Sequence, residues 1–366
     1  MVVRHPHRLP LLALGMLALL TGLWAGLVRL GWDVPLPRPG FSSLHGPLMV
    51  SGFLGTLISL ERAVALGRIW AYAAPLLTGL GGVGLIVGVP LLAAQLLILA
   101  GSLVLVAIFA AIIRRHPALY TFTMGGGAIV WALGNLLWCV GWPVFLVVFW
   151  WAAFLVVTIA GERLELARLQ QVTGTAQATF LLLLGILLAG LLLLGGSYDG
   201  GIRLFGLGLA GLALWLGRHD IARRTVKQTG LTRFIAICLL TGYVWLGISG
   251  LSAMWFGGVP VGPQYDATLH AFFLGFVFAM IFAHAPIIFP AVLGARMAYR
   301  PLFYAHVLLL QVTLAVRLIG DAAGWGAGRQ VGGLLNVVTL LLFLVNTVSA
   351  LQSPPERAGI TQARPS

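Results

Sequence analysis

Charged residues are scarce in this 366-residue sequence, making up 8% of it against about a quarter in soluble domains. Hydrophobic residues account for 60%, and the mean hydropathy is +1.02. A soluble fold would have to bury nearly all of this apolar surface with too few polar residues to cover it. The composition therefore excludes a soluble protein and indicates a protein that crosses a lipid bilayer many times.

Cysteine is also rare, and the motifs of several catalytic and cofactor classes are missing. Cys139 and Cys238 lie in separate apolar runs, so both are interpreted as small buried hydrophobes rather than as a disulfide. The sequence has no phosphate-binding loop, no C-x-x-C-H haem-attachment motif, no cysteine-rich metal site and no serine-nucleophile motif. These absences argue against nucleotide hydrolysis and against covalently attached haem.

Long apolar runs, separated by short polar or Gly- and Pro-rich breaks, predict about twelve membrane-spanning helices. The predicted spans are residues 9–29, 45–66, 69–90, 94–113, 119–140, 142–160, 177–196, 201–217, 233–256, 267–291, 301–320 and 330–350. The first run follows a basic head, as in a signal peptide, but it is too long and lacks a small-x-small cleavage site, so we expect it to be a span. The predicted fold class is an all-α polytopic helical bundle. It has a single transmembrane domain over residues 1–350 and a disordered cytoplasmic tail over residues 351–366.

The net charge of +13 comes from basic residues that fall in alternate loops. With the N-terminus in the cytoplasm, 17 of the 22 basic residues lie on the cytoplasmic side, and the C-terminus is cytoplasmic too. The other five are Arg29, Arg38, Arg203, Arg317 and Arg329. Such an asymmetry indicates contact with anionic lipid headgroups and not with nucleic acid.

Histidines inside the predicted spans are the main candidate site residues, because a polar side chain within a membrane bundle usually has a function. His270 and His284 share the tenth span, about 40° around the helix and roughly 21 Å apart along it, so one lies near each face of the bilayer. By depth, His270 matches His45 near the outer face. His284 matches His306 near the inner face.

Depth-matched histidines on different helices suit a non-covalent b-type haem, whose iron accepts two neutral imidazole nitrogens. The candidate cofactor ligands are therefore His45, His270, His284 and His306, and the outer pair is favoured over the inner pair. Met49, one turn after His45, carries a soft thioether, so His45, His270 and Met49 also form a candidate copper site. The structural alternatives are hydrogen-bonded or snorkelling histidines and a methionine that fills the core.

Few other polar groups lie inside the spans. Glu61 is interpreted either as an ion-pair partner of Arg62 or Arg68 or as a proton-uptake carboxylate. Arg317 and Asp321 are spaced to pair at i and i+4. Hydrogen bonds between helices are expected from Asn135, Tyr243 and Gln311.

At the two outer-histidine spans the sequence resembles the NnrS family, polytopic membrane proteins linked to nitric oxide in denitrifying bacteria and regarded as containing haem and copper. The segment HGPLMVSGF is similar to an early family span through His45, Met49, Gly52 and Phe53. A later family motif is matched by His270, Ala271, Gly275 and Met280, and the loop and helix after it by Leu293, Gly294, Arg300, Pro301, Leu302 and Arg317. The chain departs from the family pattern at Pro47 and Ala295, where the family has histidine, and at His284, where it has methionine.

The resemblance implies a haem-binding protein of the bacterial cytoplasmic (inner) membrane that handles or resists nitric oxide or another small diatomic. It implies haem at His45 and His270 and copper as a further cofactor candidate. Two other hypotheses stay open. One is a proton- or metal-coupled transporter that uses His45, His270 and Glu61 and in which glycine-interrupted spans form broken helices. The other is a b-type electron-transfer cytochrome, which needs haem at both histidine pairs. The sequence assigns no enzyme class. The expected partners are the lipid bilayer, haem and the diatomic ligand.

Overall fold

The computed structural model describes residue 5, residues 8–167 and residues 173–352. Within these residues, twelve helices are long and apolar enough to cross a membrane, which confirms the predicted all-α polytopic bundle. The predicted starts agree with the observed ones to within four residues; the last span, for example, begins at residue 326 rather than 330. Hydropathy alone therefore locates the membrane spans of this chain.

The first six spans run from α1 to α7. Their elements are α1 (Leu9–Arg29), η2 (Phe41–Leu44), α2 (His45–Pro47), η3 (Leu48–Gly55), α3 (Thr56–Leu66), η4 (Ile69–Tyr72), α4 (Ala73–Val87), α5 (Leu91–Arg115), α6 (Leu119–Cys139) and α7 (Val144–Ala167). The other six spans contain α8 (Gly174–Leu193), α9 (Tyr198–His219), α11 (Gly230–Phe256), α12 (Pro263–His270), η6 (Ala271–Phe278), α13 (Ala279–Leu293), α14 (Phe303–Ala322) and α15 (Gly326–Ser349). The short α10 (Ala222–Thr225) lies between the eighth and ninth spans.

Two of the spans contain a π-helix along their length. The second span passes from the 3₁₀ turn η2 through the short α2 into the π-helix η3 and then α3. The tenth span passes from α12 into the π-helix η6 and then α13. π-Helical segments are rare and often occur at functional sites.

A glycine in the left-handed region ends each of these two spans. Gly67 has φ 66° and Gly294 has φ 65°. Their N–H groups donate to the carbonyls of Ala63 and Pro290 at 3.0 and 2.8 Å. Because a side chain is strained at positive φ, the Leu-Gly sequence at both positions stops the helix there.

Helix α7 lies at the centre of the bundle: 83% of the residues in its most apolar stretch are buried, compared with 33% in α5 and in α8. The Trp131 ring of α6 stacks on the Phe154 ring of α7 at 4.9 Å between centroids. The same Trp131 ring packs against Gly55 so closely that no side chain would fit there. The peripheral helices expose leucine and valine, as expected of surfaces that face lipid.

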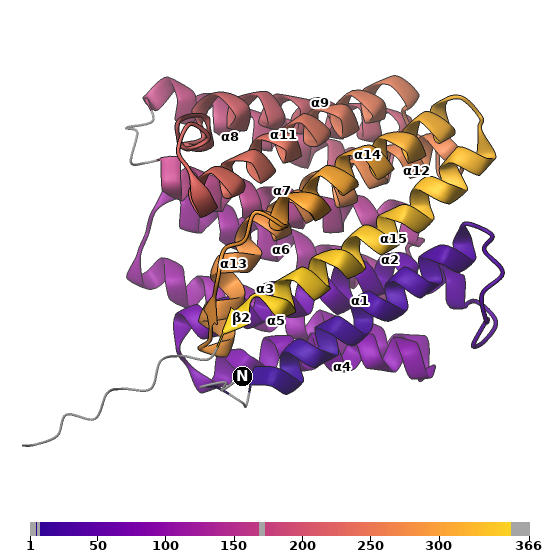
Figure 1. The fold of residues 1–366 in the computed structure, drawn as a ribbon, viewed down its shortest axis with the longest axis horizontal. Coiled ribbons are helices and arrows are strands. Elements are labelled where there is room, and N and C mark those ends of the chain that lie inside the picture. The colour runs from indigo at the N-terminus through magenta and orange to yellow at the C-terminus, as the bar shows by residue number, and fades with distance from the viewer. Residues whose placement is uncertain (1–4, 6–7, 168–172, 353–366) are drawn as a thin grey trace, which may run out of the picture.

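The two ends of the bundle differ (Figure 1). The start of α1 lies beside β1 (Arg296–Met297) and β2 (Leu351–Gln352), which pair antiparallel; we name this the terminal end. At the opposite end lie the end of α1, the start of α12 and the α14–α15 turn; we name it the histidine end. Because Leu351 and Gln352 form β2, the predicted disordered tail is wrong at its first two residues. Its remaining residues, 353–366, lie outside the described part of the chain.

Candidate functional site

A cavity of about 330 Å³ lies at the histidine end of the bundle. Its walls come from α1, the α2–η3 segment, α7, the α12–η6 segment, α14 and α15. Most of the lining is apolar and includes Leu23, Val50, Leu54, Val148, Phe273 and Leu274. This volume falls in the range of roughly 300–1,000 Å³ that small molecules and cofactors occupy.

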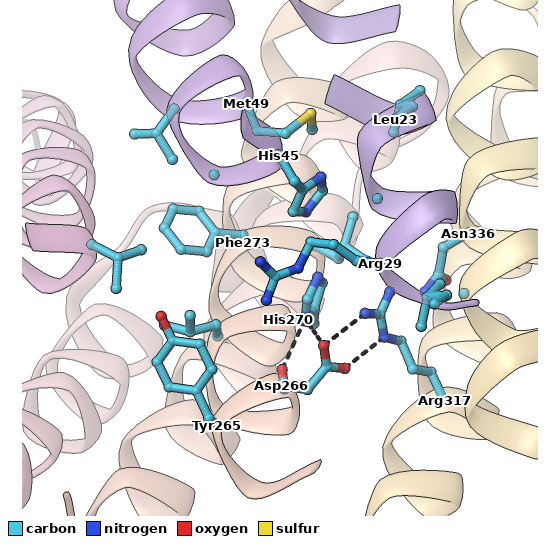
Figure 2. A pocket seen from close by; sticks show the side chains of 18 of the residues that line it. Leu23, Arg29, His45, Met49, Tyr265, Asp266, His270, Phe273, Arg317 and Asn336 are labelled. Atoms are coloured by element: carbon cyan, nitrogen blue, oxygen red, sulfur yellow. Dashed lines mark hydrogen bonds and ion pairs between the residues drawn. The ribbon is translucent and has the colours of Figure 1, made fainter. Parts of the chain in front are cut away.

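His45 and His270 face each other in this cavity (Figure 2). Their ring centroids are 6.1 Å apart, and the ring planes differ by 20°. His45 is the first residue of α2, and His270 is the last residue of α12. The structure therefore brings together the two histidines that the sequence places at the same depth.

The two histidine segments are built alike. Each histidine is followed by an eight-residue π-helix, η3 after His45 and η6 after His270. Phe53 and Phe278, each eight residues beyond its histidine, also contact each other, with centroids 6.2 Å apart and planes 20° apart. Equal offsets to two contacting pairs mean that the segments run side by side in the same direction.

Backbone carbonyls fix the orientation of both imidazoles. His45 Nδ1 lies 2.8 Å from the Gly22 carbonyl oxygen, and His270 Nδ1 lies 2.9 Å from that of Asp266. Since a carbonyl only accepts, each Nδ1 donates and each Nε2 keeps its lone pair. Neither Nε2 has a hydrogen-bond partner among the residues that the structure describes, so both lone pairs are available to a ligand.

An ion-pair network surrounds the Nδ1 side of His270. Asp266 Oδ1 lies 3.3 Å from this Nδ1, and Arg317 donates to both Asp266 carboxylate oxygens at 2.9 Å. Arg329 lies 3.7 Å from Asp266 and 3.1 Å from Asp321. The predicted Arg317–Asp321 pair is therefore wrong: Arg317 pairs with Asp266 from another helix, and Asp321 pairs with Arg329.

Three of the five arginines assigned to the outer side, Arg29, Arg317 and Arg329, line this cavity. Figure 2 shows the Arg29 guanidinium beside the two imidazoles and near Tyr265. Within the described residues no ion pair engages Arg29.

The sequence interpretation missed Asp266, Arg29 and Arg329 as site residues. The available signals were the four-residue spacing from Asp266 to His270 and the presence of arginines on the side where basic residues are scarce.

Met49 lines the cavity but does not face the space between the imidazoles. Its sulfur lies beyond His45, toward α1 (Figure 2). A Cβ on Gly22 would come within 2.8 Å of that sulfur. The thioether therefore packs on a glycine surface of α1.

The structure does not join the predicted inner histidines to each other. His284 Nδ1 lies 2.6 Å from the Met280 carbonyl oxygen, and its Nε2 lies 3.0 Å from an Arg163 guanidinium nitrogen. His306 Nδ1 lies 3.3 Å from the Asn346 side-chain nitrogen. Four phenylalanine rings surround His306: Phe234, Phe282, Phe303 and Phe343. Each inner histidine thus has structural partners of its own.

The remaining predicted polar residues make structural contacts. Glu61 pairs with Arg62 at 3.2 Å, as in the simpler of its two interpretations, and Arg62 also bonds Glu162. The predicted hydrogen bonds between helices are confirmed: Trp151 donates to Asn135 at 3.0 Å, Tyr243 to Asp220 at 2.7 Å and Trp245 to Gln311 at 2.6 Å.

The described residues contain no group of three or more His, Cys, Asp or Glu side chains arranged to hold a metal ion. Two opposed imidazoles are thus the strongest metal-ligand set in the cavity. Such a pair is sufficient for a metal whose other ligands come from a macrocycle, as in haem.

The fold and this cavity define the class: a multi-pass membrane protein with a histidine-lined pocket at one end of its bundle. The chain belongs to the family described as domain of unknown function DUF8744, whose model matches residues 8–352. No curated protein matches the sequence.

Proposed function

We propose that this chain is a haem-binding protein of the bacterial cytoplasmic membrane, in which His45 and His270 would hold one non-covalent b-type haem. The observation that carries the proposal is the 6.1 Å separation of the two imidazole centroids. Two metal–nitrogen bonds of about 2 Å each, with half a ring at either end, add up to roughly 6 Å. Both Nδ1 atoms donate to carbonyls, which leaves both Nε2 atoms for the metal.

The cavity also suits the rest of a haem. Its apolar walls match a large hydrophobic macrocycle, and its volume of about 330 Å³ is that of a cofactor site. Haem carries two carboxylates, and the guanidinium of Arg29 lies at the cavity without an ion pair in the described residues. Arginine is suited to binding carboxylates. These features favour a large group with an anionic edge.

The proposed role in handling or resisting nitric oxide rests on the resemblance to the NnrS family. Haem iron, when bound, supplies a site for nitric oxide or another small diatomic. In this chain His45 and His270 would hold and orient the haem, while the apolar walls would exclude water. The basic residues support placing the histidine end outside the cytoplasm.

A copper ion held by the same two imidazoles is a second candidate, because the 6.1 Å separation suits any metal ion bound by both rings. Met49 would have to turn its sulfur toward the imidazoles to serve as a third ligand. Haem is favoured because a bare ion leaves the volume of the cavity and the charge of Arg29 unused.

The deciding experiment is an absorption spectrum of the detergent-purified protein, oxidised and reduced, with haem and metal content per chain. We expect b-type bands and one haem per chain. The bands should disappear in the His45→Ala, His270→Ala double variant. Two haems per chain would indicate the electron-transfer cytochrome. Copper without haem would indicate the copper protein. Colourless protein with histidine-dependent uptake would indicate the transporter.

Matched controls come from the inner histidines. His284→Ala and His306→Ala each remove an imidazole from the same bundle at the other end, and each should keep the full haem content. Unchanged bands in the outer double variant, or equal losses in the outer and inner variants, would reject His45 and His270 as ligands.

A further inference from the structure

The two imidazoles at the cavity are held by unequal hydrogen bonds. Both donate Nδ1–H to a backbone carbonyl at nearly the same distance, 2.8 Å for His45 and 2.9 Å for His270. This shared contact cannot distinguish them. The difference is the Asp266 carboxylate, whose Oδ1 lies 3.3 Å from His270 Nδ1 (Figure 2).

Asp266 is itself held firmly in place. Arg317 donates two bonds of 2.9 Å to it, and the Arg317 side chain is only 7% exposed. Arg329 lies beside it at 3.7 Å and connects it to Asp321, whose side chain is 1% exposed. A carboxylate in this position orients a histidine ligand and raises its basicity, which strengthens its bond to a metal.

The backbone at His45 is less regular. His45 follows the 3₁₀ turn η2, and α2 lasts only three residues before the π-helix begins. His270, in contrast, ends the eight-residue α12, which has a proline in its first turn. No ion pair joins His45 to any described residue, and only the Gly22 carbonyl holds its imidazole.

We propose that Asp266 is a positioning residue that makes His270 the permanent metal ligand and leaves His45 as the exchangeable one, so that a small neutral ligand binds on the His45 side. The proposal rests on the proposed function above. In the exchange, the bond between the metal and His45 Nε2 breaks, and the neutral imidazole leaves with its lone pair. Its proton stays on Nδ1 and remains hydrogen-bonded to the Gly22 carbonyl oxygen. The incoming ligand donates its own electron pair, so no electron or proton is transferred.

The test uses the reduced full-length protein and carbon monoxide as the probe ligand. His45→Ala should bind carbon monoxide faster than the wild type, because no imidazole has to leave first. His270→Ala should lose haem or bind carbon monoxide more weakly. If His45→Ala binds carbon monoxide at the same rate as the wild type or more slowly, the assignment of the exchangeable ligand is overturned.

The role of Asp266 is tested by the iron–histidine stretching frequency after photolysis of carbon monoxide and by the reduction potential. Asp266→Asn should lower the frequency and raise the potential, and Asp266→Glu should restore both in part. Asp199→Asn is the matched control: it removes an exposed carboxylate that pairs with Arg203, outside the network of Asp266, and should leave the frequency unchanged. An unchanged frequency in Asp266→Asn, or equal shifts in the two asparagine variants, would overturn the proposal.

Failures of the two proposals are distinguishable. If wild-type protein holds no haem, the proposed function fails and no exchange can be assigned. If haem is present but the His45 and Asp266 variants behave otherwise than stated, only the unequal-ligand proposal fails. The carbon monoxide comparison leaves Asp266 unaltered, so it remains decisive if the Asp266 variants do not fold.

Discussion

The absence of a side chain at Gly26 determines where His45 can lie. A Cβ at this position of α1 would come within 2.9 Å of His45 Nδ1 and 3.0 Å of its Cε1. The ring also donates to the Gly22 carbonyl one turn earlier on α1, so a Cβ at Gly26 would push the ring away from α1 and from that bond. The glycine spacing of α1 thus sets the orientation of the first imidazole.

Gly26→Ala should therefore displace His45 and sharply lower the haem content of the purified protein. The cost of overpacking at a buried contact is typically about 1–3 kcal/mol. Gly15→Ala is the matched control, because a Cβ at Gly15 of the same helix meets only ordinary contacts at 3.6 Å and beyond. Equal haem content in the two variants would contradict this account of the ring position.

Arg317 is the second residue on which the cavity depends, because it holds Asp266 with two hydrogen bonds. Arg317→Lys keeps the charge but cannot make both bonds. Loss of one bond to a charged group should cost about 1.5–3 kcal/mol. The loss of stability is measured as a lower midpoint of thermal unfolding in detergent, followed by tryptophan fluorescence. Arg203→Lys changes the exposed pair with Asp199 and should leave the midpoint nearly unchanged; similar shifts would refute the special role of Arg317.

The partner of Arg317 also marks a limit of sequence reasoning at this scale. The spacing of four residues offers Asp321 as its partner, but Asp266, 51 positions away in the chain, takes its place. Local spacing gives the residues that are able to pair. The competition between partners is decided by helix packing, which the sequence alone does not reveal. The depth of His45 and His270, in contrast, follows from hydropathy, so their meeting was predictable.

At the scale of elements, the crossing of α14 and α15 brings Arg317 and Arg329 to the cavity. A Cβ at Gly332 of α15 would lie 2.7 Å from the Arg317 backbone nitrogen. The two backbones therefore touch at this crossing, as small residues allow in membrane bundles. Any side chain at position 332 would push the helices apart and move Arg317 away from Asp266.

Gly332→Ala should accordingly lower the unfolding midpoint, with a destabilisation of about 1–3 kcal/mol. Gly326→Ala, on the same helix, serves as its control, since a Cβ there meets nothing within 4 Å. We expect the control to match the wild type in midpoint and haem content. A Gly332→Ala protein as stable as that control would show that the close crossing is not required.

The π-helices are the elements that composition does not predict. Segments η3 and η6 are apolar, like the α-helical segments that follow them. Their hydrogen-bond register leaves no mark in hydropathy or in the 3.6-residue period. The sequence therefore predicts two continuous spans. The structure shows that both spans change register within three residues after a cavity histidine.

For the whole molecule, the twelve spans follow from apolar runs because no other structure satisfies so much backbone in lipid. The predicted orientation of the bundle rests on a different property, the 17 to 5 division of basic residues. Three of the five exceptions line the cavity. Since the proposed binding site accounts for their position, they do not weaken the prediction that the histidine end faces the outside.

Cysteine labelling of intact cells tests this orientation. Cys139 and Cys238 are first replaced by alanine, because Cys139 is partly exposed. Asp33→Cys, in the exposed loop after α1, should then react with a membrane-impermeant maleimide, because it lies at the histidine end. Lys227→Cys, exposed between α10 and α11, should react only after the cells are opened. If position 227 is labelled in intact cells and position 33 is protected, the bundle has the opposite orientation, and the cavity must receive its ligand from the cytoplasm.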